Sequence, residues 1–250
     1  MQLKIIIHLQ EPLTLPLSYH HTLQAIIYNL MGDAYGSSAL HDGGKSYGNR
    51  QYKLFTFSLL EGKTEITGKQ ITFTDSVSFE VRCIDENIIK CIEDNVLKNG
   101  IQFTETVYTD IECIRKNKRV TDNVILIKMI SPVCVYKTLP GSTHANYLNP
   151  MCNNFSEEIN NNFHRKYQAA QIPTLPPLSE DDNITISPIK INPKDKYLTI
   201  YKKIIIEAYN GVYVLSGKPE FLDFLYNVGI GSKNSQGFGM FNILNNIHNV

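Results

Sequence analysis

The sequence predicts an α+β protein made of two tandem βαββαβ units, and three observations lead to this prediction. Runs of alternating or β-branched residues are separated by two amphipathic helical patterns in each half of the chain. The order of these elements repeats once, after a polar segment near residue 118. A length of 250 residues is enough for two domains of ordinary size. We therefore expect one domain over 1–118 and another over 119–250.

The first unit follows the order expected of a ferredoxin-like (RRM-like) domain. In chain order we predict a strand over 4–9, a helix over 20–31, a loop over 32–50, strands over 52–60 and 70–82 joined by a turn at 61–63, a helix over 85–98 and a strand over 101–114. The apolar residues Leu23, Ile26 and Ile27 recur at the spacing of one helix face. Asp85 is placed to cap the second helix, which Gly100 ends.

The second unit repeats that order with a more polar first helix. We predict a strand over 124–136 interrupted at Ser131-Pro132, a helix over 156–170, a linker over 173–182, strands over 184–191, 200–208 and 212–215, a helix over 219–227 and a strand over 240–247. Ser156 is the expected cap of the first helix, and Pro219 suits the first turn of the second.

Composition excludes several classes of protein. The chain has 24 Lys and Arg against 24 Asp and Glu, so it is not a globally basic nucleic-acid binder, and any polyanion must be held by local patches. No apolar run approaches the ~20 residues that span a bilayer. The apolar segment at residues 1–8 is too short for a signal peptide, so we expect a cytoplasmic protein. The five cysteines are widely spaced and the histidines lack a ligand spacing, so we expect reduced thiols, no metal site and no cofactor.

The most specific segment of the sequence is the glycine-rich loop, which we define as residues 229–239. It lies between a predicted helix and the last predicted strand. Glycines allow close approach of a bulky partner to the main chain, and successive amides can bind phosphates. The candidate phosphate-binding residues here are Gly229, Gly231, Ser232, Lys233, Asn234, Ser235, Gln236, Gly237 and Gly239. A dinucleotide site is excluded by context, because that motif follows a strand and begins a helix.

This loop resembles the signature loop of the CRISPR-associated repeat-processing endoribonucleases, the Cas6 family of the RAMP superfamily. The resemblance extends over essentially the whole chain and includes the segments Leu15-Pro-Leu-Ser-Tyr19, Ile26-Ile-Tyr-Asn29, Leu40-His41, Tyr52-Lys-Leu-Phe-Thr-Phe-Ser58 and Ile130-Ser-Pro-Val133. It implies two ferredoxin-like domains that bind CRISPR repeat RNA and cut it once, without a metal. In that reaction the ribose 2′-hydroxyl attacks the adjacent phosphate and leaves 2′,3′-cyclic phosphate and 5′-hydroxyl ends.

The family's catalytic tyrosine, histidine and lysine match Tyr28, His41 and Lys53. Each residue also has an ordinary interpretation: Tyr28 as a packing residue at the edge of an apolar helix face, His41 as a surface histidine and Lys53 as an exposed strand-end lysine. Twelve positions separate His41 from Lys53, so Lys45 or Arg50 is an alternative source of the cation. Which residue acts as base and which as acid stays open.

Two basic runs are further candidates for RNA contact, against the simpler interpretation that they are solvated. The basic linker contains Arg115, Lys116, Lys118 and Arg119, and a second run contains Lys190, Lys194, Lys196, Lys202 and Lys203. Tyr19, Tyr35 and Tyr47 are candidates for stacking on bases. The resemblance also allows other Cas proteins as partners, and either a monomer or a homodimer.

Two other functions compete with the endoribonuclease. One is a non-catalytic subunit that holds repeat RNA in an effector complex, which the presence of Tyr28, His41 and Lys53 argues against. The other is a general RNA-recognition module, which the sequence disfavours because it lacks the aromatic motif of that class.

Overall fold

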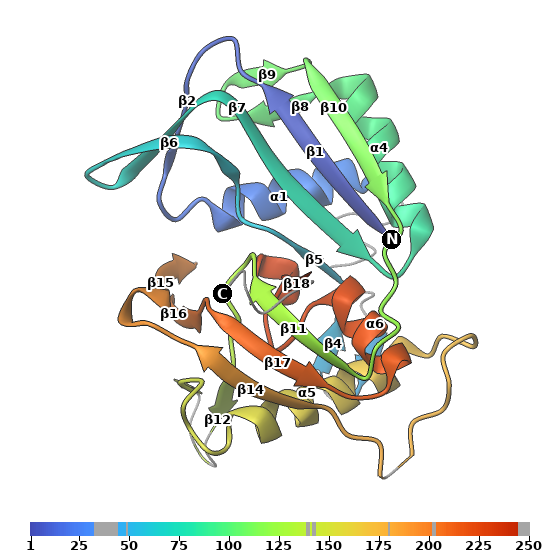
Figure 1. Cartoon of the computed structure of the whole chain (residues 1–250). Helices are drawn as coiled ribbons and strands as arrows, with labels where there is room; N and C mark the ends of the chain where they lie inside the picture. The colour runs from blue at the N-terminus through green and yellow to red at the C-terminus, as the bar shows by residue number, and fades with distance from the viewer. Residues whose placement is uncertain are drawn as a thin grey trace.

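The computed structural model describes residues 1–32, 45–48, 50–138, 141, 144–179, 181–201 and 204–244. They form two sheets with helices packed against them (Figure 1). Each sheet has its own hydrophobic core, one built mainly from the first half of the chain and one from the second. None of the helices in these ranges is long and apolar enough to cross a bilayer.

The first unit contains a six-stranded antiparallel sheet with the order β10-β1-β7-β2, in which β5 and β6 also pair with β7. Its elements are β1 (Gln2–His8), β2 (Leu13–Pro16), α1 (His20–Leu30), β3 (Lys45–Tyr47), β4 (Arg50–Tyr52), β5 (Phe55–Phe57), β6 (Glu61–Thr67), β7 (Gln70–Cys83), α4 (Glu86–Asn99), β8 (Ile101–Phe103), β9 (Thr106–Tyr108) and β10 (Ile111–Lys116). Helices α1 and α4 lie side by side on one face of this sheet (Figure 1).

The second unit contains a four-stranded antiparallel sheet with the order β14-β17-β11-β18. Its elements are β11 (Val124–Met129), β12 (Tyr136–Thr138), β13 (Ala145–Tyr147), α5 (Phe155–Ala170), β14 (Thr185–Lys190), the 3-10 turn η1 (Pro193–Asp195), β15 (Lys196–Tyr201), β16 (Ile204–Tyr209), β17 (Val212–Ser216), α6 (Pro219–Val228), the 3-10 turn η2 (Asn234–Gln236) and β18 (Phe241–Leu244). Aromatic contacts join α5 to α6, with the Phe163 and Phe221 ring centroids 5.2 Å apart.

Both sheets have the strand arrangement of a ferredoxin-like domain, so the prediction of two tandem βαββαβ units is confirmed. Both predicted helix signals around α4 are also confirmed. The Asp85 carboxylate accepts a hydrogen bond from the Asn87 amide at 2.9 Å, and Gly100 ends the helix with a φ of 70°.

Several local predictions are wrong. Residues 101–114 do not form one strand, because β8 and β9 pair as an antiparallel hairpin before β10 begins. Residues 61–63 do not form a turn, because Glu61–Thr67 continues as β6 and pairs with β7 as far as the Thr67–Gln70 pair. Residues 200–208 do not form a single strand, because β15 and β16 pair as an antiparallel hairpin. Ser156 does not cap α5: the helix begins at Phe155, and the Ser156 hydroxyl accepts a hydrogen bond from the Ile186 amide of β14 instead.

Arg82 of β7 joins the two units at a site that water does not reach. Its side chain has no exposed surface. Its guanidinium donates to the Phe241 carbonyl at 2.7 Å and to the Asn242 side chain at 2.8 Å, both in β18. The same group lies 3.9 Å from the centre of the Tyr226 ring in α6. Since one buried cation contacts both β18 and α6, it fixes how the first sheet meets the second unit.

Candidate active site

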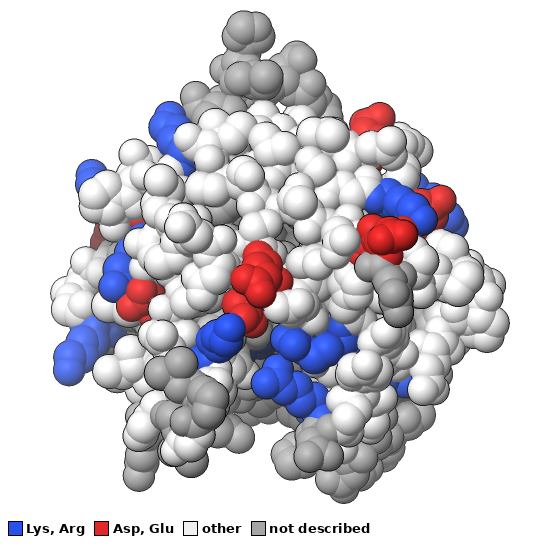
Figure 2. All heavy atoms as spheres, turned by 90° about the horizontal axis from the view of Figure 1, so that it is seen from below, with Lys and Arg blue, Asp and Glu red and all other residues white. Residues whose placement is uncertain are grey.

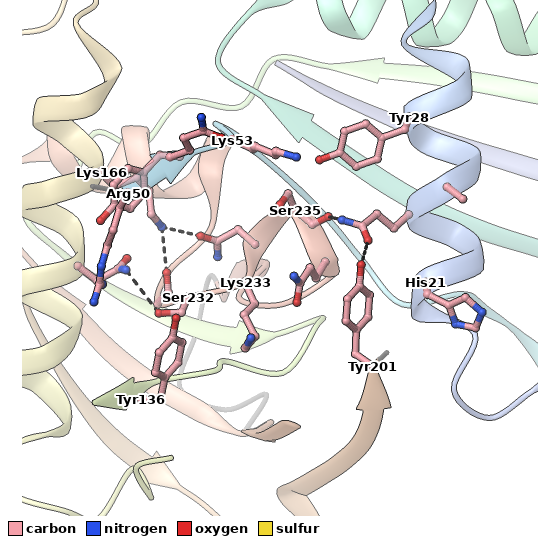
Figure 3. A pocket seen from close by; sticks show the side chains of 18 of the residues that line it. His21, Tyr28, Arg50, Lys53, Tyr136, Lys166, Tyr201, Ser232, Lys233 and Ser235 are labelled. Atoms are coloured by element: carbon pink, nitrogen blue, oxygen red, sulfur yellow. Dashed lines mark hydrogen bonds between the residues drawn. The ribbon is translucent and has the colours of Figure 1, made fainter. Parts of the chain in front are cut away.

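A cleft of about 970 Å³ lies where the two units meet. Its walls come from α1, from β4 and the residue after it, from α5 and from the glycine-rich loop (Figure 3). The lining residues are His21, Gln24, Ala25, Tyr28, Asn29, Arg50, Gln51, Tyr52, Lys53, Tyr136, Asn162, Lys166, Tyr201, Gly231, Ser232, Lys233, Asn234, Ser235 and Gln236. They include four cations and no Asp or Glu, so the described part of the cleft is positively charged.

Helix α1 presents polar side chains to the cleft because its apolar residues face the first core. Leu23 and Ile27 are buried on the core side, whereas His21, Gln24 and Tyr28 lie on the cleft side at helical spacing. Gln24 links the two units: its side chain donates to the Ser235 carbonyl at 2.6 Å and accepts a hydrogen bond from the Tyr201 hydroxyl. This link ties α1 to the glycine-rich loop and to β15.

Tyr28 and Lys53, two of the three predicted catalytic residues, lie together in the cleft. Figure 3 shows their side chains directed toward one another, and the Lys53 ammonium is 4.9 Å from the centre of the Tyr28 ring. The Tyr28 hydroxyl is buried and makes no hydrogen bond within the described chain. Burial raises the pKa of Tyr28 to about 12, and the nearby Ser235 and Gln24 side chains only partly oppose this effect. Tyr28 is therefore protonated at neutral pH.

The third predicted catalytic residue, His41, lies outside the described residues, as does Tyr35. A different histidine, His21, lines the cleft two helical turns before Tyr28. Its Nδ1 atom is 3.0 Å from the Ser18 carbonyl oxygen, which can only accept, so Nδ1 carries the proton and Nε2 is the basic nitrogen of the neutral ring. Sequence patterns did not single out His21, because it directly follows His20 at the start of a helix.

The three residues considered as the catalytic cation, Lys45, Arg50 and Lys53, differ in where they lie relative to the cleft. Arg50 lines the cleft together with Lys53, whereas Lys45 is not among the lining residues. Arg50 is exposed and Lys53 is half-buried against Tyr28. Of the cations considered from sequence, Lys53 is thus the one in contact with another candidate catalytic residue.

The glycine-rich loop is folded tightly, and only its middle reaches the cleft. Residues from Gly231 to Gln236 line the cleft, whereas Gly229, Gly237 and Gly239 are packed behind it. Gly239 has a φ of 80°, and a Cβ atom there would lie 2.0 Å from the Ile230 carbonyl oxygen. At Gly237 a Cβ atom would lie 2.6 Å from the Phe57 ring of β5. These glycines are required for the loop to fold and to pack on the first unit.

Asn234 and Lys166 hold the loop from inside. The Asn234 side-chain amide donates to the Ile230 carbonyl at 2.9 Å and the Phe238 carbonyl at 3.0 Å. The buried Lys166 ammonium donates to the Gly229 carbonyl, the Gly231 carbonyl and the Asn234 side-chain oxygen. Sequence analysis did not identify Lys166. The available signal was that Asn162 and Lys166, four residues apart, fall on the otherwise apolar face of α5.

The predicted basic runs lie elsewhere. Arg115 forms an ion pair with Glu93 on α4, and Lys118 and Arg119 line a separate, smaller pocket near Met1. Lys116 and the described lysines of the second run, Lys190, Lys194 and Lys196, do not line the cleft; Lys202 and Lys203 lie outside the described residues. Seen from below, Lys and Arg side chains gather in and beside a hollow of the surface (Figure 2), although the chain has no net formal charge.

The described tyrosines that the sequence suggested for stacking, Tyr19 and Tyr47, do not line the cleft. Tyr19 is buried, and its hydroxyl accepts a hydrogen bond from the Leu60 amide, whereas Tyr47 is exposed outside the cleft. Besides Tyr28, the cleft is lined by Tyr52, Tyr136 and Tyr201. The Lys233 ammonium is 5.4 Å from the centre of the Tyr136 ring. Within the described ranges, no group of three or more His, Cys, Asp and Glu side chains could hold a metal ion.

Fold and site together define a protein of two ferredoxin-like units with a cationic, tyrosine-lined cleft where they meet. The chain belongs to the Cas6 family. The family model described as CRISPR associated protein Cas6, C-terminal, matches residues 115–243, which is just over half of the chain.

Individual relatives agree with this membership. The chain is 26% identical over 245 residues to the CRISPR-associated endoribonuclease Cas6 1 of Methanocaldococcus jannaschii, with 90% of this chain and 86% of the relative covered. The solved structure of a Cas6-related gene product from Pyrococcus furiosus matches with a TM-score of 0.78 at 23% identity, covering 98% of each chain. A structure described as CRISPR associated protein Cas6 matches with a TM-score of 0.75 at 21% identity, covering 98% of this chain and 99% of the other. These two structural matches show a shared fold.

Proposed function

We propose that this protein is a metal-independent endoribonuclease that binds CRISPR repeat RNA and cleaves the precursor transcript within its repeats. The observation that carries the proposal is the pairing of Tyr28 with Lys53 in a cleft lined by four cations and, among the described residues, by no carboxylate. Membership of the Cas6 family and the endoribonuclease name of the M. jannaschii relative support the substrate and the reaction.

The proposed reaction needs only groups that protein side chains provide. The ribose 2′-oxygen loses its proton and forms a bond to the adjacent phosphorus. The bond from phosphorus to the 5′-oxygen then breaks, and that oxygen takes up a proton. The products are a 2′,3′-cyclic phosphate and a 5′-hydroxyl, with no water consumed. Catalysis therefore calls for a base, an acid and a cation for the extra charge on the five-coordinate phosphorus.

The assignment of roles follows from the protonation states. Tyr28 is protonated at neutral pH, so its buried hydroxyl is suited to donating a hydrogen bond to the RNA and not to removing a proton. We assign proton transfer to His41, because imidazole titrates near neutral pH. We assign Lys53 to the charge on the phosphorus, since it is the lining cation that contacts Tyr28. Carboxylates are the usual protein ligands of Mg²⁺, and the lining residues that the structure describes supply none.

The other candidate RNA contacts differ in where they lie relative to the cleft. Residues Gly231 to Gln236 are supported because they line the cleft. The basic linker, residues 115–119, lies outside the cleft, so we assign it at most to RNA that extends beyond the cleavage site.

The proposal is tested by incubating end-labelled repeat RNA with the protein in excess EDTA. We expect one cut per repeat, with a cyclic phosphate on the upstream fragment and a 5′-hydroxyl on the downstream fragment. Tight binding without cleavage would contradict the enzyme and favour a subunit that only holds repeat RNA. Cleavage only after Mg²⁺ is restored would contradict metal independence.

Replacement of Lys53 should affect chemistry more than replacement of Arg50. We expect Lys53→Met to lower the single-turnover cleavage rate by about 10²–10³-fold, the usual effect of removing one group that stabilises a developing anion. Arg50→Met is the matched control. Arg50 lines the same cleft, but the cation that lies over the Tyr28 ring is Lys53. We expect it to weaken binding with a rate within about threefold of the wild type at saturating enzyme. A larger rate loss in Arg50→Met would move the catalytic cation to Arg50.

A further inference from the structure

Gln24 joins α1 to the second unit inside the cleft. It lies one helical turn before Tyr28, on the same side of α1. Its nitrogen donates to the Ser235 carbonyl at 2.6 Å, and its oxygen accepts a hydrogen bond from the Tyr201 hydroxyl. Figure 3 shows both bonds, one to the glycine-rich loop and one to the end of β15. One side-chain amide therefore connects three elements that lie far apart in the sequence.

The chemistry of the two partners fixes the orientation of this amide. A backbone carbonyl can only accept a hydrogen bond, so the atom of Gln24 that faces Ser235 must be the nitrogen. The amide oxygen then faces Tyr201, whose phenol supplies the proton. Because each partner suits one end of the amide, a side chain of similar shape without the amide loses both connections.

Gln24 and Ser235 lie close to the hydroxyl of Tyr28. Burial raises the pKa of Tyr28 to about 12, and the Ser235 and Gln24 side chains act in the opposite direction, as polar groups within reach of the phenol oxygen do. The Lys53 ammonium lies over the same ring. The link from Gln24 to Ser235 therefore sets where the glycine-rich loop lies relative to two candidate catalytic residues.

The internal fold of the loop does not depend on Gln24. Asn234 and Lys166 bond the carbonyls of the loop from within the second unit. Gln24 bonds the loop from the first unit, at the Ser235 carbonyl. Loss of the Gln24 amide should thus leave the loop folded and change its position relative to α1.

We propose that Gln24 is a positioning residue of the cleavage reaction, which holds the glycine-rich loop beside Tyr28 so that the loop and the Tyr28 hydroxyl meet the same part of the bound RNA. This inference rests on the proposed function, because it requires cleavage of RNA in this cleft. A misplacement of about 1 Å at a reacting centre lowers a rate by about 10²-fold, whereas RNA affinity comes largely from cations that contact phosphates. Loss of Gln24 should therefore slow cleavage and leave binding largely unchanged.

The test is a double-mutant cycle of Gln24→Met and Tyr28→Phe, in which single-turnover cleavage at saturating enzyme and binding of a 2′-deoxy repeat are measured separately. We expect Gln24→Met to lower the cleavage rate by about 10–100-fold, with an affinity within about threefold of the wild type. In the Tyr28→Phe protein the same change should lower the rate by less than about threefold more, because residues that act together are not additive. A purely structural role would give the same loss in both backgrounds.

The matched control is Asn95→Leu, which also removes a side-chain amide bound to a backbone carbonyl of the first unit. The Asn95 amide donates to the Leu30 carbonyl of α1 at 2.9 Å, but it comes from α4 and does not line the cleft. We expect its cleavage rate to stay within about threefold of the wild type. A loss as large as that of Gln24→Met would mean that any loosening of α1 slows the reaction, and it would overturn the inference.

The remaining outcomes separate this inference from the proposed function. If Gln24→Met cleaves like the wild type, loses only affinity, or loses rate equally in both backgrounds, the inference is wrong while the proposed function stands. If the wild type does not cleave repeat RNA, both are wrong. If Gln24→Met does not fold, Tyr201→Phe takes its place in the cycle, because it removes the hydroxyl that donates to Gln24. We then expect a rate loss of about 3–10-fold that disappears in the Tyr28→Phe protein, and any other result overturns the inference.

Discussion

Replacing His41 by alanine is expected to lower the single-turnover rate of repeat cleavage by about 10²–10⁴-fold, because the 2′-oxygen or the leaving 5′-oxygen loses its partner for proton transfer. Binding of uncleaved repeat RNA should change less than about threefold, since phosphate contacts by cations supply most RNA affinity. The measurement is cleavage in excess EDTA at saturating enzyme, with binding measured separately on a 2′-deoxy repeat.

His21→Ala is the matched control, because His21 is the histidine that lines the described part of the cleft. Its imidazole is held by the Ser18 carbonyl two helical turns from Tyr28, so we expect its loss to change the cleavage rate by less than about threefold. Full activity of His41→Ala would contradict the catalytic assignment. Loss of activity in His21→Ala together with full activity in His41→Ala would move the catalytic imidazole to α1.

Replacing Arg82 by methionine is expected to destabilise the protein by about 3–5 kcal/mol, the usual cost of removing one member of a buried, hydrogen-bonded charge network. The change leaves the Phe241 carbonyl and the Asn242 side chain without their donor and leaves Glu80, whose carboxylate accepts from Arg82 at 2.5 Å, without its cation. For a chain of this length such a loss lowers the melting temperature by roughly 10 °C. Thermal unfolding followed by circular dichroism measures it.

Arg115→Met provides the comparison, because Arg115 also pairs with a glutamate but its side chain is 35% exposed. Exposed ion pairs contribute about 0–1 kcal/mol, so its melting temperature should fall by no more than about 4 °C. Equal melting temperatures for the two variants would show that Arg82 does not hold the units together. Because the cleft is built from both units, Arg82→Met should also lose cleavage activity at temperatures where the wild type is folded.

Much of the fold follows from local sequence patterns. Alternating strands and amphipathic helices predict both βαββαβ units, because each element has to bury one face in its own sheet. The errors occur where tertiary contacts outweigh local signals. Glu61-Gly-Lys63 looks like a turn, but seven exposed residues of β6 extend there along the long strand β7. Ser156 looks like a cap, but its hydroxyl binds the Ile186 amide thirty residues away.

The candidate site is less accessible to sequence reasoning, because it depends on which elements meet. The family resemblance predicted catalytic roles for both Tyr28 and Lys53. In the structure the Lys53 ammonium lies 4.9 Å from the centre of the Tyr28 ring. Charge counting drew attention to the basic linker, although Arg115 is engaged by Glu93 on the first unit. Lys166 escaped notice because a single lysine in an amphipathic helix is normally solvated, and only the packing of the glycine-rich loop reveals that it is buried.

The measurement that tests the central claim most directly is a crystal structure with a repeat RNA that carries a 2′-deoxy nucleotide at the cleavage position. We predict that the scissile phosphate lies in the cleft between Tyr28 and Lys53, with an ammonium hydrogen bond of about 3 Å from Lys53 to a phosphate oxygen and His41 within reach of the 2′ position or the 5′-oxygen. A scissile phosphate bound at the basic linker, with the cleft empty of RNA, would contradict the account.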